Sequence, residues 1–511
     1  MRLAAPRSRL IHGAVLAGAL AVIAATHLVG LSSTPPGLYT DEASIGYNAW
    51  TIAHHGVDQF GNAWPLLFRD FGDYKSPVST YPLAPLTLLF PLTPALTRVP
   101  SAIAGIALAA VAALLALRIT RSRAVALIVM LEAAFEPWFF HTARIDLEAD
   151  LFTVLCFVVA LCAIAGDGAR RARSWVGAGV SVAVAPLAAQ PGRFFAVVFV
   201  ALVLITYAPT VPWRNLAVFA APPVVVTAAL LLGTAGAATT RLSGVSVFTA
   251  TSPWQGFIAW IGHYFEYWNP LFLFIQGDPN LRHSSGFEGL LFVTAIPVLV
   301  AGIAVCIRRR REALCRLTLA GLLVAPLGPA LTGGISARRD IVALPFVLLT
   351  MTFGWQWLLP RLGAHRAPAF ALATATATAA GLYFADYAVA YPARAARAFD
   401  TGVAPALVAA HQAAGTHSIL VSPLVPDARE EALFALLPAP GAGDPLATMR
   451  IVITSDAAQI ETAQRGDVVV LRGDQTPPPR FELVDAEAVD GPMWLGAHSM
   501  HVALINVYRR L

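Results

Sequence analysis

Two acidic side chains and one lysine share a polar stretch, and their types suit acid–base and phosphate chemistry. Asp41 and Glu42 are adjacent in TDEASIGYNAW, and Lys75 follows in FRDFGDYKSPVSTY. A carboxylate can act as a general base or a metal ligand, and an ammonium group can bind a phosphate oxygen. Of the 35 basic residues, 34 are Arg and only Lys75 is Lys. Because Arg and Lys differ in shape and hydration, a single Lys indicates a position where those differences matter.

Each of these residues also has a simpler explanation. Acids in the first turn of a helix are stabilised by the helix dipole, so Asp41 and Glu42 could mark a helix start only. A single lysine can also arise by chance. Spacing alone therefore leaves a general base, a metal ligand and a helix-start acid as alternatives for the acidic pair.

A second polar segment, HTARIDLEADL (141–151), contains Arg144 and Glu148. Its simpler explanation is a solvated turn between two helices, in which Arg144 pairs with Asp146 or Glu148. The alternative is that Arg144 and Glu148 contribute to a binding site.

A third segment, GDPNLRHS (277–284), combines turn-forming residues with Arg282 and His283. Asp-Pro-Asn is by itself a turn signal. Arg and His beside an aromatic-rich segment can also bind a phosphate or a sugar. We interpret Arg282 and His283 as candidate substrate-binding residues.

The elements that must position these residues are membrane helices. Hydrophobic residues make up 57% of the chain and charged residues 13%, and the mean hydropathy is +0.65. Soluble proteins average about 45–50% and 25%. The sequence therefore predicts a polytopic membrane protein. Its eleven apolar segments lie at about 11–31, 98–117, 124–142, 147–165, 175–190, 194–209, 215–233, 288–307, 317–332, 341–358 and 367–387.

Arg clusters lie in alternate connections between these segments, as in RITRSR (118–123), GARRARS (168–174) and RRRRE (308–312). Such clusters mark the cytoplasmic side of a membrane. The charge of +5 thus reports orientation, and no basic stripe interleaved with aromatics indicates nucleic-acid binding. The C-terminus is expected outside the cytoplasm. The remaining outer cations, Arg193, Arg338 and Arg339, would face lipid headgroups or the anionic end of a donor.

Two outer connections are long, 32–97 and 234–287. In the first, Thr40 can cap a short amphipathic helix. A later piece, Val78 to Leu92, is interrupted by prolines and predicts an interfacial or re-entrant helix. After residue 387 the charge rises and five short β-type runs appear with helical stretches between them. We therefore predict a transmembrane module over 1–387 and an extracytoplasmic α/β domain over 388–511.

TDEASIGYNAW followed by DYKSPVSTY resembles the first extracytoplasmic loop of C-type (GT-C) glycosyltransferases. The closest likeness is to family 39, which includes protein O-mannosyltransferases and the lipid A aminoarabinose transferase. Members open this loop with Asp-Glu and continue with a Lys-Pro-Pro-like motif, which here is Lys-Ser-Pro. The resemblance implies that Asp41, beside Glu42, is the catalytic base. It also implies that Lys75, next to Tyr74, meets the lipid-linked phosphate.

The resemblance also implies a second acidic position near 141–151, which assigns Arg144 and Glu148 to substrate binding. The Arg282–His283 pattern looks like one seen in bacterial relatives. The implied fold is an all-α polytopic GT-C module of about 11 transmembrane helices with the small α/β domain. The implied activity is inverting transfer of a sugar from a polyprenyl-phosphate donor to an acceptor hydroxyl of a glycan, lipid or protein.

We expect this activity at the outer face of the cell inner membrane, among membrane lipids and without a nucleic-acid partner. Cationic side chains can stabilise the departing phosphate without a cofactor. Whether Asp41 and Glu42 also bind a divalent cation is left open by the sequence. The alternative function is a transporter or flippase of a lipid-linked precursor. Transporters place charges within the membrane, whereas the charges here gather at loop ends, which favours the enzyme. A ligand sensor is a third option, but eleven spans exceed what an anchor needs.

Overall fold

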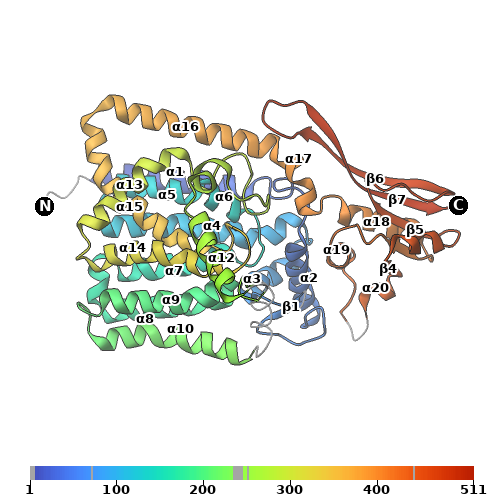
Figure 1. The fold of residues 1–511 in the computed structure, drawn as a ribbon, viewed down its shortest axis with the longest axis horizontal. Helices are drawn as coiled ribbons and strands as arrows, with labels where there is room; N and C mark the ends of the chain where they lie inside the picture. Colours follow the sequence, from blue (N-terminus) through green and yellow to red (C-terminus); the bar gives the residue numbers. More distant parts are fainter. Residues whose placement is uncertain (1–5, 71–72, 234–245, 250–251, 441–443) are drawn as a thin grey trace.

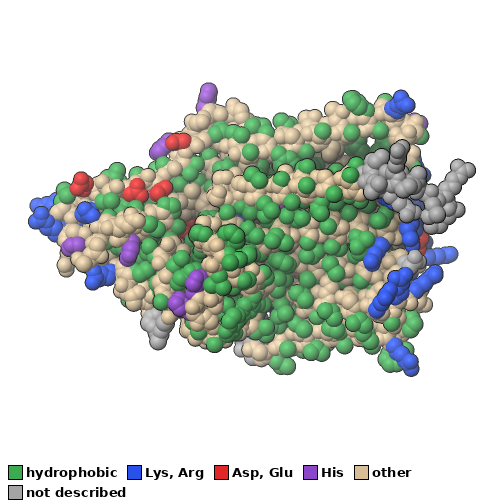
Figure 2. All heavy atoms as spheres, turned by 180° about the vertical axis from the view of Figure 1, so that it is seen from behind, with side chains coloured by type: hydrophobic (Ala, Val, Ile, Leu, Met, Phe, Trp, Pro, Cys, Tyr) green, Lys and Arg blue, Asp and Glu red, His purple; other side chains and the backbone are tan. Residues whose placement is uncertain are grey.

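The computed structural model describes residues 6–70, 73–233, 246–249, 252–440 and 444–511, so part of the predicted loop 234–287 lies outside the described residues. Long helices run side by side and form a bundle, and a sheet domain lies at one end of it (Figure 1). A group of shorter elements that includes α2 and α3 lies between the two (Figure 1). Figure 2 shows hydrophobic side chains over the visible face of the bundle and several Arg side chains at the end furthest from the sheet.

Each of the eleven predicted apolar segments coincides with helical structure in the bundle. Among the described residues, six helical segments are long and apolar enough to cross a membrane, and the pair α5 and α6, bent by 57°, makes a seventh if it counts as one span. The predicted polytopic, mostly helical fold is confirmed, while the count of eleven spans stays a prediction. The helices are α1 (Pro6–Leu28), α4 (Pro94–Thr120), α5 (Arg123–Phe135), α6 (Pro137–Ala143), α7 (Asp150–Ile164), α8 (Ala172–Ala188), α9 (Gln190–Tyr207), α10 (Trp213–Gly233), α13 (Ile296–Arg308), α14 (Ala313–Val324), α15 (Leu344–Ala364) and α16 (Arg366–Val389).

Small residues let these helices approach closely. A Cβ atom on Gly302 of α13 would lie 2.0 Å from the Thr350 carbonyl oxygen, and one on Gly354 of α15 would lie 2.1 Å from the Val298 carbonyl oxygen. Between helices surrounded by lipid, backbone approach of this kind supplies packing that apolar burial cannot. A larger side chain at either glycine would separate α13 from α15.

The intermediate layer contains α2 (Thr40–His55), the antiparallel strands β1 (Phe68–Asp70) and β2 (Asp73–Lys75), α3 (Pro77–Thr87) and α12 (Pro253–Glu266). α2 was expected to be amphipathic and capped by Thr40. Instead Tyr39 is its N-cap residue, the Glu42 carboxylate accepts from the Tyr39 amide, and nearly the whole helix is buried. The proline-interrupted piece expected to reach Leu92 forms a helix that ends at Thr87.

The C-terminal domain has the α/β composition that the sequence predicts. All five predicted β-type runs form strands of one sheet with the order β4-β3-β5-β7-β6. β3 is parallel to β4 and β5, whereas β7 is antiparallel to β5 and β6. The elements are α17 (Tyr391–Ala395), α18 (Val403–Ala414), β3 (Ile419–Val421), α19 (Ala428–Leu436), α20 (Pro445–Thr448), β4 (Ile451–Ile453), β5 (Val468–Arg472), β6 (Phe481–Pro492) and β7 (Ser499–Arg510).

The domain is docked on α2 through α19 and the residues after it. The Tyr47 hydroxyl donates to the Pro438 carbonyl at 2.7 Å. A Cβ atom on Gly46 would lie 2.7 Å from the Phe434 ring, so the two helices are in close contact. A buried ion pair between Arg394 and Asp386 joins α17 to the end of α16 at 2.5 Å. The helix that carries the candidate acidic pair is therefore covered by the C-terminal domain.

Candidate active site

The two adjacent acids of α2 have different environments. The Glu42 carboxylate accepts from Arg98 Nε at 2.7 Å and from Arg98 Nη2 at 2.8 Å, and both side chains are fully buried. Arg98 also donates to the carbonyls of Leu31, Pro35 and Gly37. Both Glu42 oxygens are therefore engaged by this guanidinium, and Arg98 connects Glu42 to the 31–37 segment. A catalytic role of Glu42 stays a prediction.

Asp41 contacts the single lysine. The β1–β2 hairpin brings Lys75 to α2, and its Nζ lies 2.7 Å from Asp41 Oδ1. The Ser76 side chain caps α3 and donates to the Leu187 carbonyl at 2.7 Å, which fixes the chain directly after Lys75. Asp41 is 7% exposed and Lys75 is 4% exposed. The predicted base and the predicted phosphate contact are thus one buried ion pair.

Arg338 joins this pair to the carboxylates of the 141–151 segment. Its Nε lies 2.9 Å from Asp150 Oδ2, and its Nη2 lies 3.1 Å from Glu148 Oε2. Its Nη1 is 3.8 Å from Asp41 Oδ2. Arg193 Nη2 lies 3.8 Å from the other Glu148 oxygen, Oε1. The cluster therefore combines three carboxylates with three cations at the end of the bundle that faces the sheet.

Burial and the neighbouring charges act in opposite directions on this cluster. Burial lowers the pKa of Lys75, but the carboxylates of Asp41 and Glu148 outweigh it, and the pKa is raised overall. Lys75 consequently stays charged across the physiological range. Burial raises the pKa of Glu148 despite the cations beside it, and burial also raises the pKa of Asp146 to about 7.

The 277–284 turn is held against the segment that carries Arg338. Asp278 Oδ2 accepts from the Ala337 amide at 2.7 Å and lies 3.1 Å from His283 Nδ1. The Arg282 guanidinium lies over the Tyr39 ring, 3.8 Å from its centre. Asp278 thus sets the position of His283 and of the residue next to Arg338.

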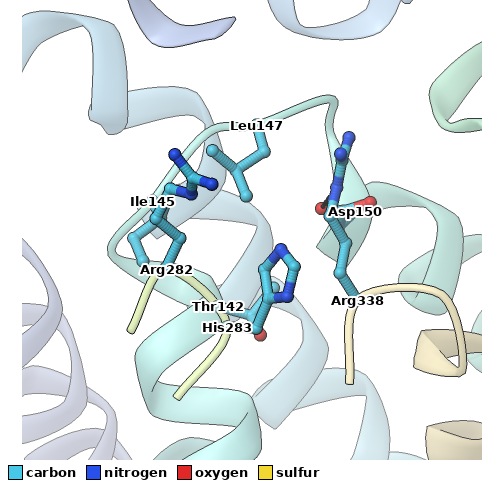
Figure 3. A pocket seen from close by; sticks show the side chains of 7 residues that line it. All are labelled: Thr142, Ile145, Leu147, Asp150, Arg282, His283 and Arg338. Atoms are coloured by element: carbon cyan, nitrogen blue, oxygen red, sulfur yellow. Dashed lines mark hydrogen bonds and ion pairs between the residues drawn. The ribbon is translucent and has the colours of Figure 1, made fainter. Parts of the chain in front are cut away.

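Some of these side chains line a small pocket (Figure 3). In Figure 3, Arg282 and His283 come from one loop, and Arg338 lies beside Asp150 across the pocket from Arg282. The lining residues are Thr142, Ile145, Leu147, Asp150, Arg282, His283 and Arg338. Two guanidinium groups and an imidazole facing one small space form an arrangement suited to an anionic group such as a phosphate.

The structure brings some of the predicted site residues together and separates others. Asp41, Lys75 and Glu148 belong to the ion-pair cluster, and Arg282 and His283 line the adjoining pocket.

Arg144 and Tyr74 have different surroundings. Arg144 donates to the carbonyls of Thr26 and Thr34 and so supports the loop after α1. The expected pair of Arg144 with Asp146 or Glu148 is not formed, and a role of Arg144 in substrate binding stays a prediction. Tyr74 is half-buried, and its carbonyl accepts from Arg193 at 2.9 Å.

Sequence reasoning left three residues of the cluster outside the candidate site. Arg193 and Arg338 were noted only as outer cations, and Asp150 was not considered. The available signal was the orientation rule, because an Arg on the outer side departs from it. In the described part of the chain, no group of three or more His, Cys, Asp and Glu residues is arranged to hold a metal ion.

No protein-family model matches the sequence, and a comparison with curated proteins finds no similar sequence. Solved structures are similar in fold. ArnT from Cupriavidus metallidurans in the apo state matches with a TM-score of 0.56 at 16% identity, over 97% of this chain and 98% of that chain. The same protein bound to undecaprenyl phosphate matches with a TM-score of 0.55 at 15% identity and the same coverage.

The archaeal oligosaccharyltransferase AglB from Archaeoglobus fulgidus, in complex with an inhibitory peptide and a dolichol-phosphate, matches with a TM-score of 0.52 at 14% identity. This match covers 91% of the present chain and 70% of AglB. These proteins are GT-C glycosyltransferases, so the chain has the GT-C fold, as the resemblance of its first loop implied.

Proposed function

We propose that this GT-C chain is a membrane glycosyltransferase that moves a sugar from a polyprenyl-phosphate donor to an acceptor hydroxyl at the outer face of the inner membrane. The observation that carries the proposal is the buried contact of 2.7 Å between Asp41 and Lys75 beside Arg338. It places a carboxylate and two cations at one point, next to a cationic pocket. The undecaprenyl phosphate and dolichol-phosphate bound to ArnT and AglB support the donor class.

Asp41 is the proposed general base. Its carboxylate accepts the proton of the acceptor hydroxyl while the hydroxyl oxygen forms a bond to the anomeric carbon of the sugar. The bond between that carbon and the phosphate oxygen breaks, and its electron pair leaves with the polyprenyl phosphate. Attack opposite the leaving group inverts the anomeric configuration.

Lys75 and Arg338 are the proposed contacts of the leaving phosphate. An ammonium group has three donors, and the bond from Lys75 to Asp41 uses one of them, so Lys75 can hold Asp41 and a phosphate oxygen together. Negative charge on the phosphate grows as the sugar departs, and fixed cations stabilise it. In the adjoining pocket, Arg282 and His283 are placed to contact the phosphate or the sugar.

Glu42 and Glu148 have supporting roles in this proposal. Glu42 fixes the start of α2 through Arg98, and Glu148 orients Arg338. No step of the mechanism requires Asp41 and Glu42 to share a metal ion, because their carboxylates have different partners.

The function is tested with purified protein in liposomes that contain a synthetic polyprenyl-phosphate sugar. We expect polyprenyl phosphate to be released only when a hydroxyl acceptor is present, with one sugar transferred for each molecule released. Mass spectrometry of both products measures this ratio. Movement of intact donor between leaflets without release would instead identify a lipid transporter. Comparing the lipid-linked sugars and envelope glycans of cells with and without the gene identifies the natural sugar and acceptor.

We expect Lys75→Ala to slow transfer at limiting donor by about 10- to 150-fold, because a charge-assisted contact contributes about 1.5–3 kcal/mol. Lys75→Arg keeps the charge, but a planar guanidinium group needs more room than an ammonium group, and Lys75 is only 4% exposed. We therefore expect Lys75→Arg to regain only part of the activity that Lys75→Ala loses. The measurement is transfer rate against donor concentration for the three proteins. Full activity of Lys75→Ala would show that Lys75 does not hold the donor.

A further inference from the structure

A second pocket lies at the opposite end of the bundle from the ion-pair cluster. α15 begins shortly after Arg338, and Arg361 lies near its other end. The pocket is between α13 and α15 and has a volume of about 250 Å³. Its lining residues are Val305, Arg308, Arg309, Gln356, Trp357 and Arg361. It belongs to the end of the bundle where Arg side chains are concentrated (Figure 2).

Two of the three guanidinium groups in this pocket are held by neighbouring groups. Arg309 pairs with Glu312 at 2.7 Å and donates to Gln356 Oε1 at 3.2 Å. Arg361 lies over the Trp357 ring, 3.9 Å from its centre, and donates to the Trp357 carbonyl. Within the residues that the structure describes, Glu312 is the one carboxylate paired with these cations, so the pocket has an excess of positive charge.

An apolar surface leads to the pocket along α13. Val300 is 61% exposed and Ile307 is 49% exposed, and Ile303 between them is also exposed. These residues follow helical spacing on one face and end at Arg308. A cationic pocket at the bundle end is therefore continuous with an apolar surface at the depth of the lipid chains.

We propose that this pocket binds the phosphate headgroup of an anionic phospholipid, with the acyl chains of the lipid along α13. Basic pockets between transmembrane helices recognise such headgroups, and guanidinium groups match phosphate oxygens in pairs. Trp357 lies at the level of the headgroups, where its amphipathic ring is favoured. Free phosphate has no acyl chains to contact the apolar surface of α13, so this surface favours a lipid over free phosphate as the ligand. This site is separate from the proposed sugar transfer.

The test is native mass spectrometry of the purified full chain with phosphatidylglycerol and with phosphatidylcholine of the same chain length. The pocket variant is Arg308→Gln/Arg361→Gln. The matched control is Arg310→Gln/Arg311→Gln, which removes two charges from the same Arg run without changing the pocket lining. At about 1 kcal/mol for each cation near a headgroup, we expect phosphatidylglycerol to bind the pocket variant about 10- to 30-fold more weakly than wild type. The control should stay within about threefold, as expected for charges outside the pocket.

Three results would overturn this proposal. One is equal retention of phosphatidylglycerol by the pocket variant and the control. Another is equal binding of phosphatidylcholine and phosphatidylglycerol to wild type, since the headgroup charge would then have no effect. A third is displacement of the lipid by millimolar inorganic phosphate, which would indicate a site for free phosphate. If the double variant fails to fold, Arg308→Gln alone serves, with an expected loss of about fivefold.

Discussion

Asp41→Asn should reach the membrane in normal amounts and transfer sugar about 10²- to 10⁴-fold more slowly than wild type, the usual loss when a general base is removed. The substitution keeps the size of the side chain and an oxygen that can accept from Lys75 at 2.7 Å. It removes the basic carboxylate that takes the acceptor proton. The measurement is the rate of transfer at saturating donor, with the amount of folded protein determined in parallel.

A matched control for this variant is Asp58→Asn. Asp58 lies in the same connection between α1 and α4 and is buried, and its Oδ1 accepts from the backbone amides of Phe60 and Asn62. An Asn side chain keeps that acceptor, so we expect the rate to stay within a few-fold of wild type. Near-normal transfer by Asp41→Asn would contradict the proposed base and leave Asp41 as a partner of Lys75 only.

Arg98→Met should cost about 3–5 kcal/mol of folding stability, because it leaves the Glu42 carboxylate buried without a cation. The same change breaks the bonds to the carbonyls of Leu31, Pro35 and Gly37. The measurement is the unfolding transition of the purified protein in detergent, followed by tryptophan fluorescence. We expect loss of activity to accompany loss of folded protein.

The double variant Arg98→Met/Glu42→Gln separates two costs to stability, that of burying an unpaired Glu42 charge and that of losing the other Arg98 contacts. Gln can still accept from the amides of Tyr39 and Asp146, so the double variant should be more stable than Arg98→Met alone. Arg472→Met, which removes one partner of an exposed ion pair, is the control and should not change stability measurably. If Arg98→Met unfolded like wild type, the Arg98–Glu42 pair would not be what holds the 31–37 segment.

Local pattern was sufficient to predict the elements of this fold. The apolar segments became helices because a span must satisfy its own backbone hydrogen bonds. The runs SILVS and DVVVLRG became β3 and β5, since β-branched residues bounded by turn formers favour strands. Helix limits were harder to predict. Tyr39 replaced Thr40 as the cap of α2 because the Glu42 side chain closes the turn from within the helix.

The candidate site was predicted only in part, because its contacts join distant segments. Successive helix residues point about 100° apart, so Asp41 and Glu42 have different neighbours, and the sequence alone does not say which residues those are. In the structure, Arg98 forms an ion pair with Glu42, whereas Lys75 forms one with Asp41. Arg338 lies 190 residues from Glu148, and no spacing rule connects them. The carbonyl partners of Arg144 leave no signal in side-chain types, since every residue has a carbonyl.

The contact of the C-terminal domain with α2 has a consequence for the order of events during synthesis. Tyr47 and Pro438 are 391 residues apart, so α2 has no final partner when it first leaves the ribosome. At about 5–20 residues per second, the chain needs about 20 to 80 s more to complete that contact. During this interval α2, which carries Asp41, is uncovered on the side that α19 later occupies. A nascent chain can therefore insert and associate with lipid well before α19 covers α2, and the surroundings of Asp41 are complete only after the C-terminal domain has been synthesised.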